Sequence, residues 1–458
     1  MRRSMPAPVV ALRGLLERAL PGGALLLSVV TFAGYLLGFV RDIVQARTFG
    51  AGAELDAYNA AFQIPEIALG VLVASGLSAP FVPLFLALRH EDARAAERFV
   101  GTILTLAGLI AIIAIPILWV FAPATVDFVG HGFSPEQRAL YVDLFRLMLV
   151  TPLLFAISDV LGELLIAERR FLGYAIAPLL YNLGIVGGSL LLGRTLGIHG
   201  AAIGAIAGAG AHLLIRLIAV RRSRIRLRPT LALRTAEFRR FVALMIPRMA
   251  GHPIDPLTFT QLGSLASTVA VGGVSSLSFA RNFQSVPVSV LAVSFALAVF
   301  PTLSLAVADG DRRGFIVLVV RTSATVAVLT TAAGVALAGL ARIVIELFFR
   351  GGAFTQEAVD RTTLVLVVLC LAIPFESVGQ VLSRAVFATR NTVLQVAASL
   401  GGYAVVIAAA SVLTPAIGIA GVALGYALGM AVKMLLLAVA VAVRARRIPV
   451  LSRAGSSG

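Results

Sequence analysis

GFVRDIVQARTFGAGAELDAYNAAFQIPEIALGVLVASGLSAPFVPLF, residues 38–85, places charged side chains and prolines within two long apolar runs. The charged residues at issue are Arg41, Asp42, Asp56 and Glu66. An ionised side chain at the centre of a membrane helix costs at least about 2.5–3.5 kcal/mol, so it persists where it faces a polar cavity or a partner. Several such residues beside proline bends favour a membrane protein that moves something over one that merely anchors something.

The composition of the whole chain indicates a polytopic membrane protein. Of its 458 residues, 59% are hydrophobic and 13% are charged, and the mean hydropathy is +0.97. Soluble domains carry about 25% charged residues. The formal net charge of +16 comes mostly from arginines in short loops between apolar runs. That distribution is the pattern of membrane orientation rather than of nucleic-acid binding.

About twelve apolar runs are long enough to cross a bilayer, because a spanning helix needs about 20 apolar residues. The second, seventh and eighth runs are over-long and carry proline or glycine, which predicts bent or tilted helices. Arginine is concentrated in the tails and in the loops on the same side, so both termini are expected in the cytoplasm. The predicted spans are 24–46, 56–88, 97–123, 139–166, 173–193, 198–220, 238–268, 273–307, 315–341, 359–388, 392–413 and 417–443.

The two halves of the chain match at a fixed spacing. The same offset of 221 residues relates Gly197, Gly200, Gly204 and Gly208 to Gly418, Gly421, Gly425 and Gly429, and Pro80 to Pro301. Six spans per copy give both copies the same membrane orientation. We therefore expect two lobes related by a pseudo-twofold axis along the membrane normal, with a substrate path between them. Glycines spaced by four form a smooth face on which helices pack closely.

The expected fold is therefore an all-α membrane protein of two six-helix lobes with basic cytoplasmic ends. The linker between the lobes is explained either as a loop that sets membrane orientation or as a contact for anionic lipid, and the two explanations are compatible. The expected parts are a cytoplasmic amphipathic segment at 1–20, the N-terminal lobe at 21–220, the basic cytoplasmic linker at 221–237, the C-terminal lobe at 238–443 and a cytoplasmic tail at 444–458.

Arg41 and Arg281 are the strongest candidates for binding an anionic substrate in a cavity. The planar guanidinium group binds two oxygens of a diphosphate or carboxylate at once. Asp56 and Glu66 lie in the same charged stretch and join the predicted substrate-binding set. The alternative for Arg41 is a structural pairing with Asp42 or Asp56, and the sequence leaves both explanations open.

A second polar group is a candidate coupling-ion site. Asp255 lies between Pro253 and Pro256, whose spacing predicts an opened helix with free backbone carbonyls. Glu376 and Gln380 are one helical turn apart and complete the predicted set. An ordinary helix kink with a hydrogen-bonded aspartate is the alternative. Coupling to Na⁺, to H⁺ or to the membrane potential stays open.

The sequence contains no pattern typical of an enzyme. It lacks a phosphate-binding Walker motif, a nucleophile–base set and a dinucleotide fingerprint. The single cysteine excludes an intrachain disulfide, and the five histidines show no metal-ligand spacing. We therefore expect no catalytic residues, no metal and no cofactor.

Three segments resemble the MurJ/MviN lipid II flippases of the multidrug/oligosaccharidyl-lipid/polysaccharide exporter superfamily. They are GFVRDIVQARTFGAGAELDAY with FQIPE and FVPLF, then MIPRMAG, and then LSFARNFQSVPVSVLAVSFALAVFPTLS. The resemblance implies transfer of a polyprenyl-diphosphate-linked peptidoglycan precursor from the inner to the outer leaflet of the bacterial cytoplasmic membrane. It also implies alternating access between two lobes, with cavity arginines meeting the diphosphate.

The chain departs from the family pattern at three arginine positions. Tyr35, Gly70 and Asn282 stand where the family usually has arginine, with Arg281 one residue before the last of these. A shift of one residue turns a helical side chain by about 100°. Asn282 nevertheless joins the predicted substrate-binding set as the position that matches the family. The family commonly has fourteen spans, whose last two help to form a groove for the lipid tail, whereas twelve are predicted here. Either another surface accepts the tail or the substrate differs.

A lipid II flippase that contacts membrane lipid and its lipid-linked precursor is the leading hypothesis. We expect it to be a monomer, and cell-wall synthesis proteins are candidate partners. The alternatives are an exporter of another lipid-linked glycan, a cation-coupled drug exporter, and a membrane scaffold that does not transport. Retention of Arg41, Asp56 and the prolines favours a transporter over a scaffold.

Overall fold

The computed structural model describes residues 24–70, 75–223, 225–249 and 253–448, and every regular element among them is a helix. Nine helices in this part of the chain are long and apolar enough to cross a membrane. A tenth span forms if Gln356–Cys370 and Ile373–Ala388, which bend by 45° at their junction, are counted together. The predicted all-α polytopic fold is therefore confirmed. The expected N-terminal segment 1–20 lies outside the described residues.

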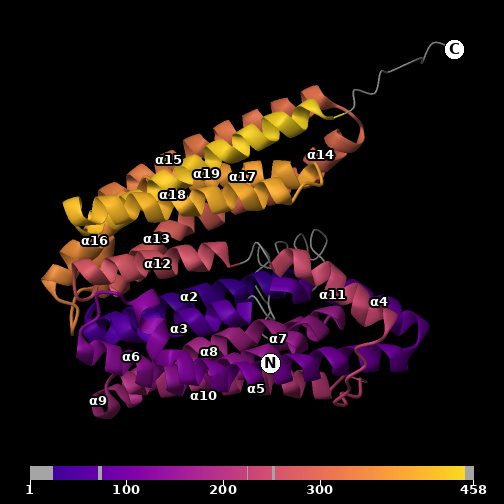
Figure 1. Ribbon diagram of the computed structural model, residues 1–458, viewed down its shortest axis with the longest axis horizontal. Coiled ribbons are helices and arrows are strands. Elements are labelled where there is room, and N and C mark those ends of the chain that lie inside the picture. The colour runs from indigo at the N-terminus through magenta and orange to yellow at the C-terminus, as the bar shows by residue number, and fades with distance from the viewer. Residues whose placement is uncertain (1–23, 71–74, 224, 250–252, 449–458) are drawn as a thin grey trace, which may run out of the picture. The chain divides into compact units, whose positions relative to one another are not determined.

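The first half of the chain follows the predicted spans closely (Figure 1). Several helices extend past the apolar run that predicted them, because polar residues at their ends continue the helix. The helices are α2 (Ala24–Phe49), α3 (Ala53–Leu69), α4 (Ser75–Glu91), α5 (Ala93–Val129), α6 (Pro135–Met148), α7 (Val150–Ala167), α8 (Phe171–Leu191), α9 (Gly193–Leu196) and α10 (Ile198–Arg221).

The second half contains a π-helix where the sequence predicted a bend. This π-helix begins directly after Pro287, whose missing N–H removes an ordinary helical hydrogen bond. The elements are α11 (Ala236–Met249), α12 (Ile254–Val269), α13 (Gly273–Pro287), η2 (Val288–Val293), α14 (Ser294–Ala308), α15 (Arg312–Phe349), α16 (Gln356–Cys370), α17 (Ile373–Ala388), α18 (Val393–Ile417) and α19 (Ile419–Arg446).

The contacts divide the chain into two compact units. The N-terminal unit consists of Met1–Thr48, Ile64–Pro123 and Val142–Met249. The C-terminal unit consists of Phe49–Gln63, Ala124–Tyr141 and Ala250–Gly458, so two segments from the first half of the chain belong to it. The first of these segments supplies contacts to α13 and α16 that are described below.

Matching backbone geometry in the two halves supports the predicted repeat. Gly197 and Gly418 precede α10 and α19 with nearly identical torsion angles, φ 57° and ψ −140° against φ 61° and ψ −143°. Arg169 and Arg390, also 221 residues apart, are the two non-glycine residues of the described chain with positive φ, at 57° and 55°. A left-handed arginine is uncommon, so its recurrence at the repeat spacing indicates a common origin of the two turns.

The two glycine rows bring pairs of helices into close contact. Helix α8 packs along α10, and α18 packs along α19 (Figure 1). A Cβ atom at Gly204 would overlap the carbonyl oxygen of Gly184, and one at Gly425 would lie 2.5 Å from the backbone nitrogen of Ala410. The predicted packing role of both rows is therefore confirmed.

Gly204→Ala should destabilise the protein, whereas Gly210→Ala on the same helix should not. The added methyl at Gly204 meets backbone of α8, and overpacking of this kind costs about 1–3 kcal/mol. At Gly210 nothing lies within 4 Å, and alanine in a helix gains about 0.5–1 kcal/mol over glycine. Thermal unfolding of the purified variants in detergent measures both, and equal melting temperatures would refute the packing argument.

The basic linker lies alongside α5 within the N-terminal unit. The backbone nitrogens of Thr230 and Ala232 donate to the hydroxyl oxygens of Thr105 and Thr102, at 3.1 and 3.2 Å. Gly101 leaves room for this approach, since a Cβ there would overlap the carbonyl oxygen of Arg228. The extended segment is thus tied to a helix by its own backbone hydrogen bonds.

Candidate functional site

Arg41 lies in α2 and is bound on two sides within the N-terminal unit. Its Nε and NH2 donate to Oδ1 of Asp42 at 3.1 and 2.8 Å, and its NH1 donates to Oδ1 of Asn182 in α8 at 3.1 Å. The side chain is 29% exposed, against 8% for Asp42. The pairing with Asp42 foreseen as an alternative is therefore present. The same pairing fixes the direction of a guanidinium group that stays partly accessible.

Glu66 lies near Arg41 in the same unit. Its carboxylate is close enough to the Arg41 guanidinium to interact with it electrostatically. Tyr35, which stands where the family usually has arginine, is 73% exposed on α2. Arg41 and Glu66 thus come together as predicted, while Asp56 belongs to the other unit.

Asp56 binds the first turn of α13. Its Oδ2 accepts a hydrogen bond from the Gly272 nitrogen at 2.7 Å, and its Oδ1 accepts two from Ser275, from the nitrogen at 2.7 Å and from Oγ at 2.6 Å. The carboxylate is 1% exposed and satisfies N–H groups that a helix start leaves unpaired. Arg361 closes the same junction, with donations to Ala51 O and Ser276 Oγ, each at 3.1 Å. Asp56 therefore joins α3 to α13 in this structure.

Asp56→Asn should lower stability by about 1–3 kcal/mol, because an amide has one acceptor oxygen and leaves a buried N–H of α13 without a partner. Glu54→Gln makes the same chemical change on an exposed side chain two residues earlier and should leave the melting temperature unchanged. Thermal unfolding of both variants is the measurement. An Asp56→Asn protein as stable as the Glu54→Gln control would show that the junction carries little free energy.

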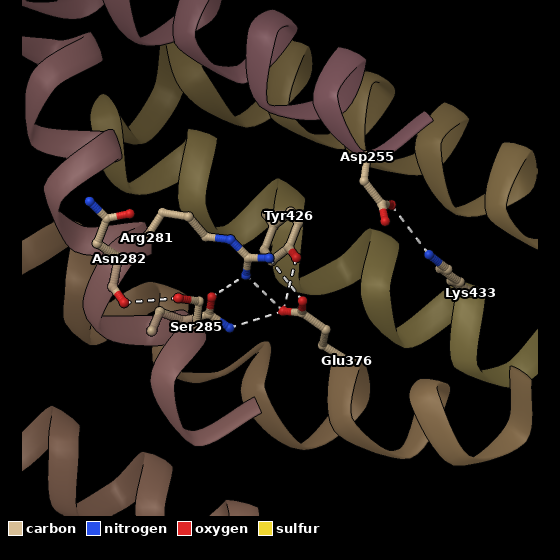
Figure 2. A network of polar contacts seen from close by, with 8 residues as sticks. Asp255, Arg281, Asn282, Ser285, Glu376, Tyr426 and Lys433 are labelled. Atoms are coloured by element: carbon tan, nitrogen blue, oxygen red, sulfur yellow. Dashed lines mark hydrogen bonds and ion pairs between the residues drawn. The ribbon is translucent and has the colours of Figure 1, made fainter. Parts of the chain in front are cut away.

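Arg281 and Glu376 form a largely enclosed ion pair inside the C-terminal unit, with side chains 23% and 11% exposed (Figure 2). NH1 and NH2 of Arg281 donate to Oε2 and Oε1 of Glu376 at 2.8 and 2.9 Å. The Tyr426 hydroxyl and Gln284 Nε2 also donate to Glu376 Oε2, at 2.9 and 3.0 Å. The guanidinium carbon stacks 4.5 Å from the Phe259 ring centroid. This two-point pairing makes Arg281 and Glu376 each other's main charged partner.

Asn282, the next residue along α13, points away from this network (Figure 2). Its side chain is exposed, and its backbone oxygen accepts a hydrogen bond from Ser285 Oγ at 2.9 Å. The arginine at 281 therefore faces the interior of the C-terminal unit, as the one-residue shift predicts. The structure separates the two predicted substrate-binding positions of α13 onto different faces.

Asp255, Glu376 and Gln380 line one cavity of the C-terminal unit, with a volume of about 150 Å³. The predicted coupling-ion residues are thus brought together. Asp255 is 3.5 Å from the ammonium of Lys433, which continues the glycine row of α19 by one more turn. Within the described part of the chain, no group of three His, Cys, Asp or Glu residues is arranged to hold a metal ion.

A second buried polar cluster, which lies in the N-terminal unit, is centred on Arg216, a residue that the sequence did not single out. Arg216 is 4% exposed and donates to Asp159 Oδ1 at 3.0 Å and to the Ser158 carbonyl at 2.7 Å. The Ser158 hydroxyl is 2.8 Å from Nδ1 of His212. Arg216 lies one turn after His212 on the glycine face of α10, and that spacing was the available signal. Tyr426 and Gln284 carried no comparable signal.

The fold of the described helices is one that solved membrane transporters share. The structure resembles an inward-facing multidrug resistance MATE family transporter of the MOP superfamily, with a TM-score of 0.76, 14% sequence identity, and coverage of 90% of this chain and 95% of that one. It also resembles a lipid II flippase MurJ in an inward closed conformation, with a TM-score of 0.77, 24% identity and coverage of 93% and 90%.

Residues 45–452 match the family model described as Lipid II flippase MurJ, and the chain belongs to this family. A probable lipid II flippase MurJ of Thermotoga maritima is 27% identical over 397 residues, which cover 87% of this chain and 80% of the relative. The lipid II flippase MurJ of Burkholderia cenocepacia is 23% identical, over 90% and 82% of the two chains. The chain is therefore a multi-pass membrane transporter and not an enzyme.

Proposed function

We propose that this protein is a flippase that moves lipid II, a polyprenyl-diphosphate-linked peptidoglycan precursor, from the inner to the outer leaflet by alternating access. The observation that carries the proposal is the match of residues 45–452 to the Lipid II flippase MurJ family. Two further features support it: the six-plus-six repeat and an arginine held partly accessible inside the N-terminal unit.

Arg41 is the proposed contact for the diphosphate. Guanidinium groups bind phosphate oxygens through two parallel hydrogen bonds, which a lysine cannot reproduce. Asp42 and Asn182 hold the group in one direction, so that less conformational entropy is lost when the substrate binds. Glu66 offsets part of the positive charge, which favours release after transfer.

The proposed location is the bacterial cytoplasmic membrane, with both termini in the cytoplasm, as a monomer that serves cell-wall synthesis. The arginines of the tails and of the loops on the same side support this orientation. Export of another lipid-linked glycan is the second candidate. Tyr35, Gly70 and Asn282 in place of the usual arginines favour a substrate that makes fewer charge contacts.

Complementation distinguishes these candidates. Cells depleted of their own lipid II flippase should regain growth when this chain is expressed, and purified protein in proteoliposomes should transfer labelled lipid II between leaflets. Failure of both assays with well-folded protein would reject lipid II. Transfer of a different polyprenyl-diphosphate glycan in the same vesicles would then identify the second candidate as correct.

A further inference from the structure

Lys433 is the only lysine of the sequence, and it lies in the middle of α19. Its side chain is 16% exposed, and its Nζ is 3.5 Å from Oδ1 of Asp255 in α12 (Figure 2). The chain has 38 lysine and arginine residues in total, and the other 37 are arginines. The Asp255 side chain is 76% exposed, so the ammonium is the more enclosed member of the pair. An ammonium in the middle of a membrane helix is costly and calls for an explanation.

The neighbouring helix is shaped to admit the lysine stem. Gly402 of α18 faces it, and a Cβ at that position would lie 2.7 Å from Cβ and 3.3 Å from Cγ of Lys433. Lys433 therefore enters the polar cavity that also contains Gln380, Arg384 and Gln395, instead of extending toward the helix end. An ammonium supplies three donors and no acceptor, so it adds no ligand for a metal ion in this cavity.

Each carboxylate of the cavity already faces a cationic side chain of the same protein. Glu376 holds Arg281 at two points, and Asp255 holds Lys433. An inorganic cation that bound the exposed Asp255 carboxylate would have to remain close to the Lys433 ammonium, which lies 3.5 Å from Oδ1. Repulsion between like charges at such a separation opposes this, most strongly where water is scarce.

We propose that the Lys433 ammonium takes the place of a coupling cation at Asp255, so that the C-terminal unit operates without Na⁺. In this arrangement the positive charge that neutralises Asp255 is carried permanently by α19. Replacing Lys433 by a neutral side chain vacates the position and leaves an aspartate with nearby amide and hydroxyl oxygens, which suits Na⁺. The consequence for transport rests on the proposed function, whereas the cation binding itself does not.

The test measures thermal unfolding of the full-length protein in detergent, in NaCl and in choline chloride of equal ionic strength. Na⁺ should raise the melting temperature of Lys433→Met by about 3 °C or more at saturation, and should leave the wild type unchanged. Lys433→Arg retains the charge and should not respond. Arg384→Met removes another positive charge from the same cavity without vacating Asp255, and it should not respond either.

In the unfolding measurement, two outcomes overturn the proposal. One is a Na⁺-specific rise in the wild type, and the other is a folded Lys433→Met protein that responds to Na⁺ no more than Arg384→Met does. Transport in proteoliposomes, with Na⁺ replaced by N-methylglucamine, separates the proposal from the flippase assignment. Transfer that requires Na⁺ would overturn the lysine inference alone. Absence of lipid II transfer, with melting temperatures as expected, would overturn the proposed substrate alone.

Discussion

Arg41→Ala is expected to lower lipid II transfer by about a hundredfold or more while the protein stays folded. The substitution removes the guanidinium proposed to bind the diphosphate, and each hydrogen bond to a charged group contributes about 1.5–3 kcal/mol. Arg41→Lys should recover only a small part of the rate, since an ammonium cannot form the two parallel bonds. The measurement is initial transfer in proteoliposomes at matched protein content.

Arg47→Ala is the matched control for this experiment. Arg47 lies on the same helix, near its end, and its side chain is exposed. The control should transfer lipid II at a rate close to that of the wild type. Full activity of Arg41→Ala would remove Arg41 from the substrate site and leave only its structural pairing with Asp42 and Asn182.

Glu376→Ala is expected to destabilise the C-terminal unit by about 3 kcal/mol or more, because it leaves the Arg281 guanidinium buried without its charge partner. The side chains of Arg281 and Glu376 are 23% and 11% exposed, and Glu376 also accepts hydrogen bonds from Gln284 and Tyr426. The double variant Arg281→Met with Glu376→Leu should recover much of the loss, since apolar replacement of a buried pair is often neutral.

Glu357→Ala provides the comparison for an exposed pair. Glu357 is 84% exposed and lies 3.3 Å from NH1 of Arg361, so its loss should cost less than about 1 kcal/mol. Thermal and denaturant unfolding of the three variants gives the comparison. Equal effects of Glu376→Ala and Glu357→Ala would show that the Arg281 network is solvated rather than buried.

The helices and the repeat were predictable because they depend on local pattern. Apolar runs of membrane length predict which segments cross the bilayer, and glycines spaced by four predict which helix faces pack together. The pairing of Arg41 with Asp42 was foreseen as well, because the partners are adjacent in sequence. Arg281 was expected to turn away from position 282 for the simple reason that each helical residue rotates by about 100°.

The partners of the remaining charges could not be predicted, because they lie far away along the chain. Asp56 contacts Ser275 over a separation of 219 residues, Lys433 meets Asp255 over 178, and Arg281 meets Glu376 over 95. A sequence shows that such a charge needs compensation in an apolar setting, but not which of several opposite charges provides it. Two of the partners of Asp56 are backbone N–H groups at the start of α13, and no residue type in the sequence identifies such groups as partners.

The sequence by itself therefore determined that this chain is an all-helical membrane transporter with an internal repeat. It also identified Arg41, Asp56, Arg281 and Asp255 as charges in apolar surroundings that need a partner or a polar cavity. Hydrophobic length and periodicity suffice for the first conclusion, because the bilayer accepts few alternatives. Only the tertiary structure decided which of these charges are already neutralised. Packing brings Arg281 within 2.8 Å of Glu376, with both side chains largely enclosed, and it brings Lys433 within 3.5 Å of Asp255, whose side chain is 76% exposed. Charges attract more strongly where water is excluded, so the first pairing is the tighter one.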